Sequence, residues 1–358
     1  MLYAYTLLFG LMIVSICQCK KYKFVELDYK YIGGVTMNIR EIVGKIRSSK
    51  EDGIKEVFLV ACGGSLVDMY ASQYFLQSEA RELRALSYTS NEFVHAIPKS
   101  LGKSSVVIVC SHGGNTPETV EAAKVAKEKG AATITLTHNK DADLIKYADY
   151  NILYEWGNDT SVEDNPMAII LNIAVEILNQ TEIYEGYNKF MEGLKIVNDV
   201  VKRGQGLVAE RAKRYAEKYK DETITYVLGS GASYGHAYGF SICSLMEMQW
   251  MNASAVHSGE YFHGPFEVTD KETLYLLLMN EGRTRELDER ALKFLNKYGA
   301  KVEVVDCKEL GISVIDNSVV EFFNPIVFYS ILCVYRGELA KIRNHDLDTR
   351  RYMGKVEY

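Results

Sequence analysis

Two patterns of apolar and polar residues recur along this chain. Short apolar runs without charged side chains occupy residues 57–62, 106–110 and 133–137, and each is followed by a longer amphipathic stretch. Runs of this kind predict strands that are buried on both faces of a parallel sheet. The stretch 118–129 has the helical period and stops at Gly130, a residue common at helix C-termini. Strands and helices in this order predict an α/β fold with a doubly wound parallel sheet.

The same pattern starts again in the second half of the chain. Its two beginnings are alike, because Val-Ala-Cys-Gly-Gly-Ser at 60–65 corresponds to Val-Leu-Gly-Ser-Gly-Ala-Ser at 227–233 with one residue added. The pattern therefore predicts two related α/β units in tandem. A strand, a helix and two later strands of the second unit are expected at residues 224–229, 237–250, 274–279 and 302–306.

A chain of 358 residues is long enough for two domains of ordinary size. Residues 166–220 have a helical pattern throughout, which suits a connector, and 324–343 predict a last helix before a polar tail. We therefore expect a first domain, a helical connector, a second domain and a C-terminal tail at residues 37–185, 186–220, 221–342 and 343–358.

The first 36 residues differ from the rest of the chain. Residues 2–17 are uncharged and largely apolar, and three lysines follow at positions 20, 21 and 23. The segment has neither the basic start nor the cleavage site of a signal peptide, and it is shorter than the ~20 residues of a membrane span. A non-native extension before a start at Met37 is therefore favoured over a membrane anchor. A helical pattern begins just after that methionine, with apolar positions Ile39, Ile42, Val43 and Ile46.

Net charge and cysteine spacing bear on the binding partner and on the redox state of the compartment. The net charge is −6, which argues against a nucleic-acid partner, because binding a phosphate backbone needs clustered Lys and Arg. Seven cysteines occur at irregular spacings without a Cys-x-x-Cys pair. This usage predicts reduced thiols in a reducing compartment, and we expect a cytoplasmic protein.

Two loops that follow predicted strands are rich in small residues. One is Cys62-Gly-Gly-Ser65, and the other is Ser111-His-Gly-Gly-Asn-Thr-Pro117. In parallel sheets ligands bind at the carboxyl ends of the strands, where these loops lie. The second loop combines hydroxyls, an asparagine and glycines that allow close backbone approach at the start of a helix, which favours an anion. A phosphate site is therefore favoured over an ordinary capped turn.

A third loop, Gly229-Ser-Gly-Ala-Ser-Tyr-Gly235, resembles a dinucleotide-binding fingerprint only in part. Its spacing is Gly-x-Gly-x-x-x-Gly, and no acidic residue ends the next strand to hold a ribose. Glu247 comes at about the right distance but falls within the predicted helix. A nicotinamide cofactor is therefore not expected.

Glu247 and His263 are the candidates for proton transfer. Glu247 lies in an otherwise apolar helical stretch, where burial is expected to make its carboxylate an effective base. His263 precedes Gly-Pro, which holds it in a rigid turn. A solvent-facing glutamate and a structural turn histidine are the alternatives. A metal site made of His257, Glu260 and His263 is disfavoured, because their spacing does not fit a helical zinc motif.

At these residues the chain resembles the double sugar isomerase (SIS) domain family, and within it the fructosamine 6-phosphate deglycases. The resemblance extends from about Met37 to the C-terminus. The chain is also similar to the isomerase half of glucosamine-6-phosphate synthase, where the same interval separates the catalytic glutamate and histidine as separates Glu247 and His263. The most specific motifs are VACGGS, CSHGGNTPETV, LMEMQW, HSGEYFHGPFE and RRYMGKVEY, at residues 60–65, 110–120, 245–250, 257–267 and 350–358.

The resemblance implies roles for individual residues. Ser65 corresponds to a sugar-contacting serine, Glu247 to the proton-transfer glutamate, and His263 to a ring-opening histidine that reaches in from a second subunit. Lys355 aligns with the tail lysine of the synthase. Gly113 stands where the synthase has a phosphate-binding serine, so a hydroxyl is lost there. Phosphate binding is implied for the side chains of Ser111, His112 and Thr116 and the backbone N–H groups of Gly113, Gly114 and Asn115.

The implied reaction converts a fructosamine 6-phosphate and water to glucose 6-phosphate and a free amino acid, without a metal or redox cofactor. Too few residues precede the first predicted strand for the synthase's glutaminase domain, so amino-sugar synthesis is not expected. A different aldose–ketose isomerase would use the same glutamate and histidine. A non-catalytic sugar-phosphate sensor would normally add a DNA-binding helix-turn-helix, for which the segment before residue 55 is too short. The enzyme is expected to be a homodimer or larger homo-oligomer with shared active sites.

Overall fold

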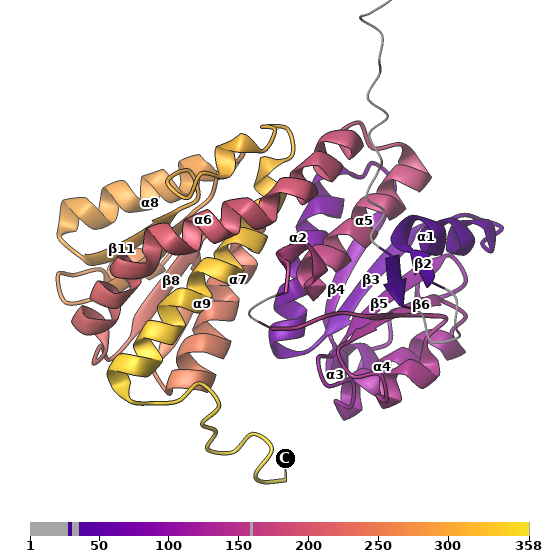
Figure 1. The fold of residues 1–358 in the computed structure, drawn as a ribbon, viewed down its shortest axis with the longest axis horizontal. Helices are drawn as coiled ribbons and strands as arrows, with labels where there is room; N and C mark the ends of the chain where they lie inside the picture. The colour runs from indigo at the N-terminus through magenta and orange to yellow at the C-terminus, as the bar shows by residue number, and fades with distance from the viewer. Residues whose placement is uncertain (1–27, 31–35, 158–159, 358) are drawn as a thin grey trace, which may run out of the picture.

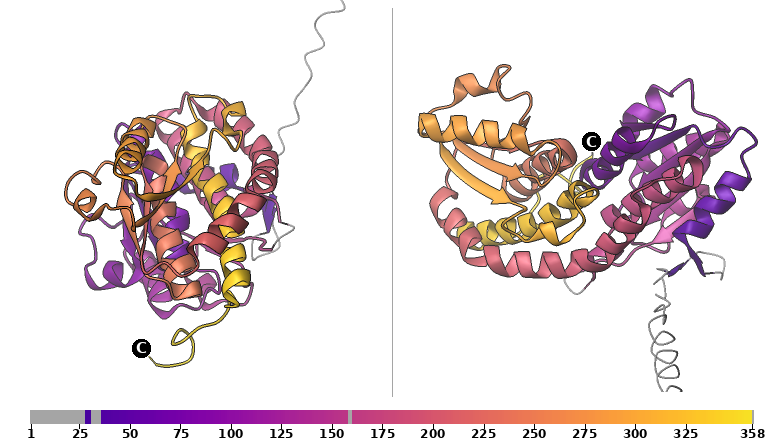
Figure 2. Two further views of the ribbon diagram at one scale, coloured as in Figure 1. Left: turned by 90° about the vertical axis from the view of Figure 1, so that its left-hand side faces the viewer. Right: turned by 90° about the horizontal axis from the view of Figure 1, so that it is seen from above.

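A computed structural model of the chain describes residues 28–30, 36–157 and 160–357. It contains two α/β units that are joined by a long helix (Figure 1, Figure 2). The apolar segment 2–17, interpreted above as part of a non-native extension, lies outside the described residues. Within the described part of the chain, no helix is both long enough and apolar enough to cross a membrane.

The first unit is built on a five-stranded parallel sheet with strand order β4-β3-β5-β6-β7. Almost all side chains of its three central strands are buried, because helices cover both faces of the sheet. These three strands confirm the expected ranges to within one residue. The strands are β3 (Glu56–Ala61), β4 (Arg84–Thr89), β5 (Ser105–Cys110), β6 (Ala132–Thr137) and β7 (Tyr150–Leu153).

Helices connect these strands and enclose the sheet. The first helix begins with a capping box, in which the Asn38 side chain accepts from the Glu41 N–H and the Glu41 carboxylate accepts from the Asn38 N–H. Its apolar stripe, which includes Ile42 and Ile46, is buried as the pattern predicts. The helices are α1 (Ile39–Ser48), α2 (Gly63–Glu79), α3 (Ser90–His95), α4 (Pro117–Glu128) and α5 (Pro166–Glu182).

The second unit has a four-stranded parallel sheet with strand order β11-β10-β8-β9. Three of its strands confirm the expected ranges to within one residue. The fourth, β9, is not apparent from the apolar pattern, and neither are β4 and β7. All three lie at the edge of a sheet, where one side of the strand is less covered and polar side chains interrupt the apolar run. The strands are β8 (Thr225–Gly229), β9 (Ala253–His257), β10 (Leu274–Met279) and β11 (Lys301–Asp306).

The helix expected over residues 237–250 differs from the structure. Instead, α7 (Tyr234–Gly239) begins three residues earlier and continues directly as a π-helix, η4 (Phe240–Met248). π-Helical turns are rare and occur frequently at functional sites. The other helices of this unit are α8 (Arg285–Tyr298) and α9 (Asn324–Arg343), and α9 matches the expected range.

One long helix, α6 (Tyr187–Tyr219), joins the two units. It begins beside the first unit and lies along α9 of the second, as Figure 1 shows. Its range is close to the connector expected at 186–220, and the domain boundaries that we place at its ends remain a prediction. Apolar residues of α6 and of both units form one continuous core, in which Phe190 contacts the rings of Phe75 and Phe323.

Two short strands and several single-turn helices complete the fold. β1 (Asp28–Lys30) and β2 (Thr36–Asn38) pair antiparallel, so β1 and the first residue of β2 belong to the expected N-terminal extension. The 3₁₀ segments are η1 (Asp143–Tyr147), η2 (Val162–Asp164), η3 (Gly231–Ser233), η5 (Pro265–Val268), η6 (Ile312–Val314) and η7 (Val320–Phe323).

Candidate active site

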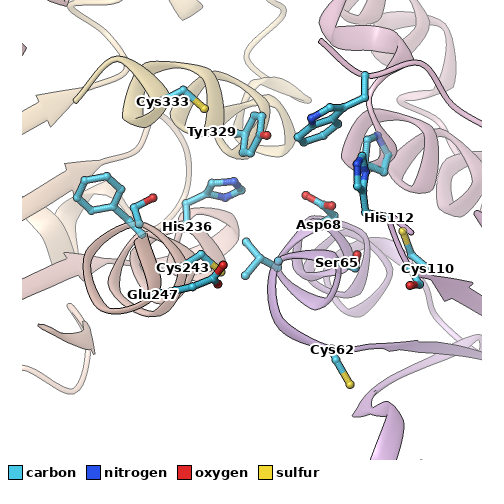
Figure 3. A pocket seen from close by; sticks show the side chains of 18 of the residues that line it. Cys62, Ser65, Asp68, Cys110, His112, His236, Cys243, Glu247, Tyr329 and Cys333 are labelled. Atoms are coloured by element: carbon cyan, nitrogen blue, oxygen red, sulfur yellow. The ribbon is translucent and has the colours of Figure 1, made fainter. Parts of the chain in front are cut away.

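A cavity of about 430 Å³ opens between the two units. Its walls come from α2 and the loops after β3 and β5 on one side, and from α7, η4 and α9 on the other (Figure 3). The two loops lie at the carboxyl ends of the strands of the first sheet, where α/β proteins bind ligands. The cavity volume is in the range of small-molecule sites.

The loop after β5 forms a cradle at the first-unit side of the cavity. The Ser111 hydroxyl accepts a hydrogen bond from the Gly114 N–H at 3.1 Å and lies 3.1 Å from Thr116 Oγ1. Gly114 has a φ of +69°, and a Cβ atom at this position would lie 2.2 Å from the Ala142 Cβ. Glycine is therefore required both by the backbone conformation and by the close packing. These contacts fix the shape of the loop without a ligand.

The backbone of this loop offers free donors. Among the described residues, the N–H groups of Gly113, Asn115 and Thr116 have no acceptor. They lie at the N-terminus of α4, where the helix dipole favours an anion. The Asn115 side chain is used elsewhere, because its Oδ1 accepts from the Asp143 N–H at 2.8 Å. Asn115 thus offers a ligand its backbone rather than its amide.

A cluster of rings borders the cradle. His112 Nδ1 lies 3.0 Å from the Tyr154 hydroxyl, and the His112 ring stacks on that of His138 with 5.2 Å between the centroids. The ring of Trp156 lies 5.0 Å from that of His112. Burial and the neighbouring His138 lower the pKa of His112. His112 is therefore a neutral hydrogen-bonding group near pH 7 rather than a cation.

The loop after β3 forms the adjoining part of the wall. Gly64 and Ser65 in the first turn of α2 line the cavity. Cys110, at the end of β5, lines the cavity beside this loop. Burial raises the pKa of Cys110, so this thiol stays protonated and is not an activated nucleophile.

Glu247 lines the opposite side of the cavity from η4. Its side chain keeps 25% of its accessible surface, and its Oε1 lies 2.7 Å from Nη2 of Arg350 in the C-terminal tail. The expectation that apolar residues bury Glu247 is therefore wrong. Its neighbours Met246 and Trp250 are themselves exposed, because this end of the π-helix lies at the surface. The carboxylate is held by an ion pair instead.

The C-terminal tail packs beside Glu247. The guanidinium of Arg351 lies 4.3 Å from the ring centroid of Trp250, which is close enough for a cation–π contact. Lys355 Nζ donates to the Arg350 carbonyl at 2.6 Å. Lys355 is exposed and is not among the described residues that line the cavity. It supports the tail segment that carries Arg350.

His263 lies apart from the cavity that Glu247 lines. It is exposed in the turn between β9 and β10, and its N–H donates to the Glu260 carbonyl at 2.9 Å. The following Gly264 has a φ of +127°, so the turn is as tight as the Gly-Pro sequence predicts. Within the described ranges, no group of three or more His, Cys, Asp or Glu side chains is placed to hold a metal ion.

The structure brings most of the predicted site residues to one cavity. Gly114 and Asn115 belong to the same loop but do not line the cavity themselves, and His263 and Lys355 lie outside it. The predicted residues on the cavity wall are Ser65, Ser111, His112, Gly113, Thr116 and Glu247.

Several polar residues of the cavity wall were not predicted from the sequence, and three of them are ionisable side chains on helices that face the cavity. Asp68, His236 and Arg336 lie on α2, α7 and α9. Each stands among apolar or small neighbours within a helix, which is the one signal that the sequence offered. A polar residue in such a position usually pairs with another polar group of the protein. Only the packing of the three helices shows that these side chains line a cavity instead.

The glycine-rich loop after β8 is closed, although its sequence resembles that of the loop after β3. Ser230 is buried, and its hydroxyl donates to the Thr284 carbonyl at 3.1 Å and accepts from Asn280 Nδ2 at 2.9 Å. Asn280 in turn donates to Asp288 Oδ2 at 2.7 Å. A Cβ atom at Gly231 would lie 2.4 Å from Thr284 Oγ1. Neighbouring side chains therefore fill the space that a ligand would need.

Known deglycases resemble the chain over most of its length. Residues 54–174 match the SIS domain family. The fructosamine deglycase FrlB of Bacillus subtilis is 41% identical over 319 residues, which are 89% of this chain and 97% of that protein. The fructoselysine 6-phosphate deglycase of Escherichia coli K12 is 24% identical over 85% of this chain and 87% of its own length.

Two further proteins are similar to the chain. The glutamine–fructose-6-phosphate aminotransferase of Helicobacter pylori is 22% identical over 85% of this chain and 52% of its own length. A crystal structure from Salmonella typhimurium LT2, of a protein assigned as a phosphosugar isomerase, has a TM-score of 0.88 and 47% identity, covering 89% of this chain and 96% of that chain. The expected α/β fold with two parallel-sheet units is confirmed.

Proposed function

The chain belongs to the SIS-domain family, and on that premise we propose that it is a fructosamine 6-phosphate deglycase. A glycated amino acid with phosphate on its sugar would react with water to give glucose 6-phosphate and the free amino acid. The two deglycase relatives support this class of reaction. The observation that carries the proposal is a single cavity with an anion cradle at Ser111 and Thr116 on one side and the carboxylate of Glu247 on the other.

The phosphate would bind in the loop after β5. The N–H groups of Gly113, Asn115 and Thr116 lack an acceptor, and the hydroxyls of Ser111 and Thr116 are close enough to join them. Hydrogen bonds to a charged group contribute about 1.5–3 kcal/mol each. Gly113 has no hydroxyl, but its N–H is available, so the cradle supplies enough donors for a phosphate.

Glu247 would move the proton that isomerisation requires. It removes a proton from C1, the carbon that bears the amine, and the C2 carbonyl becomes the hydroxyl of an enaminol. The protonated Glu247 exchanges its proton with solvent and delivers one at C2, which leaves an imine between C1 and the nitrogen. Water adds to C1, the C1–N bond breaks, and the amino acid leaves as glucose 6-phosphate forms. Positioned proton transfer of this kind typically contributes about 10²–10⁴-fold to the rate.

A second subunit would supply His263 for opening of the sugar ring. His263 is exposed and lies outside the cavity of its own chain, so it is available to a neighbouring chain. A symmetric homodimer would build two equivalent sites. Such a contact would also cover Met246 and Trp250, which are exposed beside Glu247. We place the reaction in the cytoplasm, where free thiols persist.

Measurement of both products tests the proposed reaction. The purified protein is incubated with fructosamine 6-phosphates made from several amino acids, and glucose 6-phosphate and the free amino acid are assayed separately. We expect the two products in equal amounts. Fructose 6-phosphate serves as the control substrate. Isomerisation of fructose 6-phosphate with no amino acid released would identify an isomerase, and binding without turnover would identify a sensor.

Mixing two inactive variants tests the shared site. Glu247→Gln and His263→Ala proteins are each expected to be inactive and are allowed to exchange subunits. In a mixed dimer, one site then receives both intact residues and the other receives neither. Random mixing makes about half the dimers mixed, so about a quarter of all sites should work. If exchange is confirmed by mass spectrometry and activity does not return, both residues act within one subunit.

A further inference from the structure

Three polar side chains in the cavity can form hydrogen bonds or ion pairs that the described residues do not supply. His236 is 4% exposed, and both of its ring nitrogens are without a partner among the described residues. Asp68 forms no hydrogen bond or ion pair within the ranges that the structure describes, and Arg336 has no carboxylate partner there. Asp68 and His236 point into the cavity from opposite walls (Figure 3).

Burying polar groups without hydrogen-bond partners lowers the stability of the ligand-free protein. Burial raises the pKa of Asp68 to about 7 and lowers that of His236 to about 3, because each group loses water without gaining a partner. Most buried polar atoms in proteins have a hydrogen-bond partner, so an exception needs a reason. Binding of a polar ligand between these walls would satisfy them together.

The three groups and the proposed base line the same cavity. Cys243 lies on η4, one turn before Glu247, and its thiol is within electrostatic reach of Glu247, Asp68 and Arg336. In the proposed reaction Glu247 acts on C1, and the amine is bonded to that carbon. A substrate with its C1 at Glu247 can place the nitrogen and its substituent toward Asp68, His236 and Arg336, which line the same cavity.

We propose that Asp68, His236 and Arg336 form a subsite for the amino-acid part of the substrate, an inference that rests on the proposed function. Asp68 accepts a hydrogen bond from the amine nitrogen. Arg336 and a ring N–H of His236 bind the carboxylate. A carboxylate acceptor facing two donors matches an amino acid, whereas a simple amine leaves both donors without a partner.

Arg336 is prepared for this contact by Tyr329. The guanidinium carbon lies 6.0 Å from the centroid of the Tyr329 ring, which is a cation–π contact. A guanidinium that is already oriented loses less freedom when a carboxylate binds. Arg336 should therefore distinguish substrates by their carboxylate with little rearrangement.

A matched pair of substrates tests the subsite. The fructosamine 6-phosphates of alanine and of ethylamine differ only by the carboxylate. We expect kcat/KM of the wild-type enzyme to favour the alanine conjugate by about 10- to 100-fold. Arg336→Gln should lower kcat/KM for the alanine conjugate and leave the ethylamine conjugate nearly unchanged, and His236→Phe should do so in part. Asp68→Asn should lower kcat/KM for both conjugates, because both contain the amine.

Three controls separate binding from folding and from the proposed function. Arg336→Lys should restore part of the preference, and Arg47→Gln, on the exposed face of α1, should change neither conjugate. An equal loss of kcat/KM on both conjugates for Arg336→Gln would overturn the subsite. A wild-type enzyme with the same kcat/KM for both conjugates would also overturn it, and this result does not depend on whether a variant folds. No glucose 6-phosphate from either conjugate would contradict the deglycase function instead.

Discussion

The loop after β5 in the first unit and the loop after β8 in the second both follow a buried strand and lead into a helix. In the first unit, the N–H groups of Gly113, Asn115 and Thr116 have no acceptor among the described residues, and the loop lines the cavity. In the second unit, Ser230 is buried and bonded to Thr284 and Asn280. One loop is open to a ligand, and the other is closed by its own unit.

The difference comes from the neighbours of each loop. In the second unit, the segment after β10 contributes Asn280 and Thr284, which occupy the space above the glycines. This unit contributes to the cavity through η4 and Glu247 instead. Glycines and hydroxyls after a strand thus indicate a tight turn, and only unsatisfied donors indicate a binding site. We infer that the first unit binds the phosphate and the second carries out the proton transfer.

Replacement of the base should have the largest effect. Glu247→Gln should lower kcat by about 10²–10⁴-fold, because it removes the group that transfers the proton while keeping its shape. Binding of glucose 6-phosphate, measured by calorimetry, should stay nearly unchanged, because the cradle lies on the other unit. A loss of kcat below this range would count against Glu247 as the base.

Replacement in the cradle should affect binding rather than the rate. Thr116→Val removes a hydroxyl from a charged ligand and should raise KM by about 10- to 100-fold, equivalent to about 1.5–3 kcal/mol. Thr116→Ser, which keeps the hydroxyl, is the matched control and should stay within a few-fold of the wild type. A Thr116→Val enzyme with normal KM and reduced kcat would show that the phosphate lies elsewhere.

Replacement in the closed loop should affect stability alone. Ser230→Ala leaves Asn280 without one of its acceptors and should cost about 1–3 kcal/mol of unfolding free energy. Denaturant unfolding measures this loss, and KM should equal that of the wild type. A raised KM in a Ser230→Ala protein of normal stability would mean that the second loop also binds substrate.

The smallest effect should be on how stability depends on pH. Asp68 has an ordinary pKa of 3.8 and a folded-state pKa of about 7. Between these values the unfolded chain has released a proton that the folded protein keeps, so stability falls as pH rises from about 4 to 7 and stays lower above. Asp68→Asn should therefore raise the thermal midpoint at pH 8 and leave it unchanged at pH 4. A gain at pH 4 alone would contradict the burial of this carboxylate.

The sequence was sufficient for the parts of the fold that local pattern determines. Central strands such as β5 have continuous apolar runs, and α9 has a clear helical period, so their ranges were predicted closely. The edge strands β4, β7 and β9 lack such a run, whereas the edge strand β11 was predicted to within one residue. The π-helical form of residues 240–248 has no distinct apolar period and was taken for an α-helix.

The site could be predicted only where its residues are close in sequence. Glycines and hydroxyls between residues 111 and 117 marked the cradle, because one loop supplies them all. The surroundings of Glu247 could not be predicted, since its partner Arg350 comes from the C-terminal tail. Asp68 and His236 lie on helices of different units, and their meeting in one cavity depends on how the units pack.

Deuterium transfer to C2 tests most directly whether the first unit binds the phosphate and the second unit transfers the proton. A fructosamine 6-phosphate is turned over in D₂O, and the glucose 6-phosphate formed is examined by NMR for deuterium at C2. The wild type should give product with deuterium at C2, and Thr116→Val should do so at a similar rate once substrate is saturating. Glu247→Gln should give almost none, although it still binds the sugar phosphate. Deuterium at C2 formed by Glu247→Gln at the wild-type rate would contradict the assignment of proton transfer to the second unit.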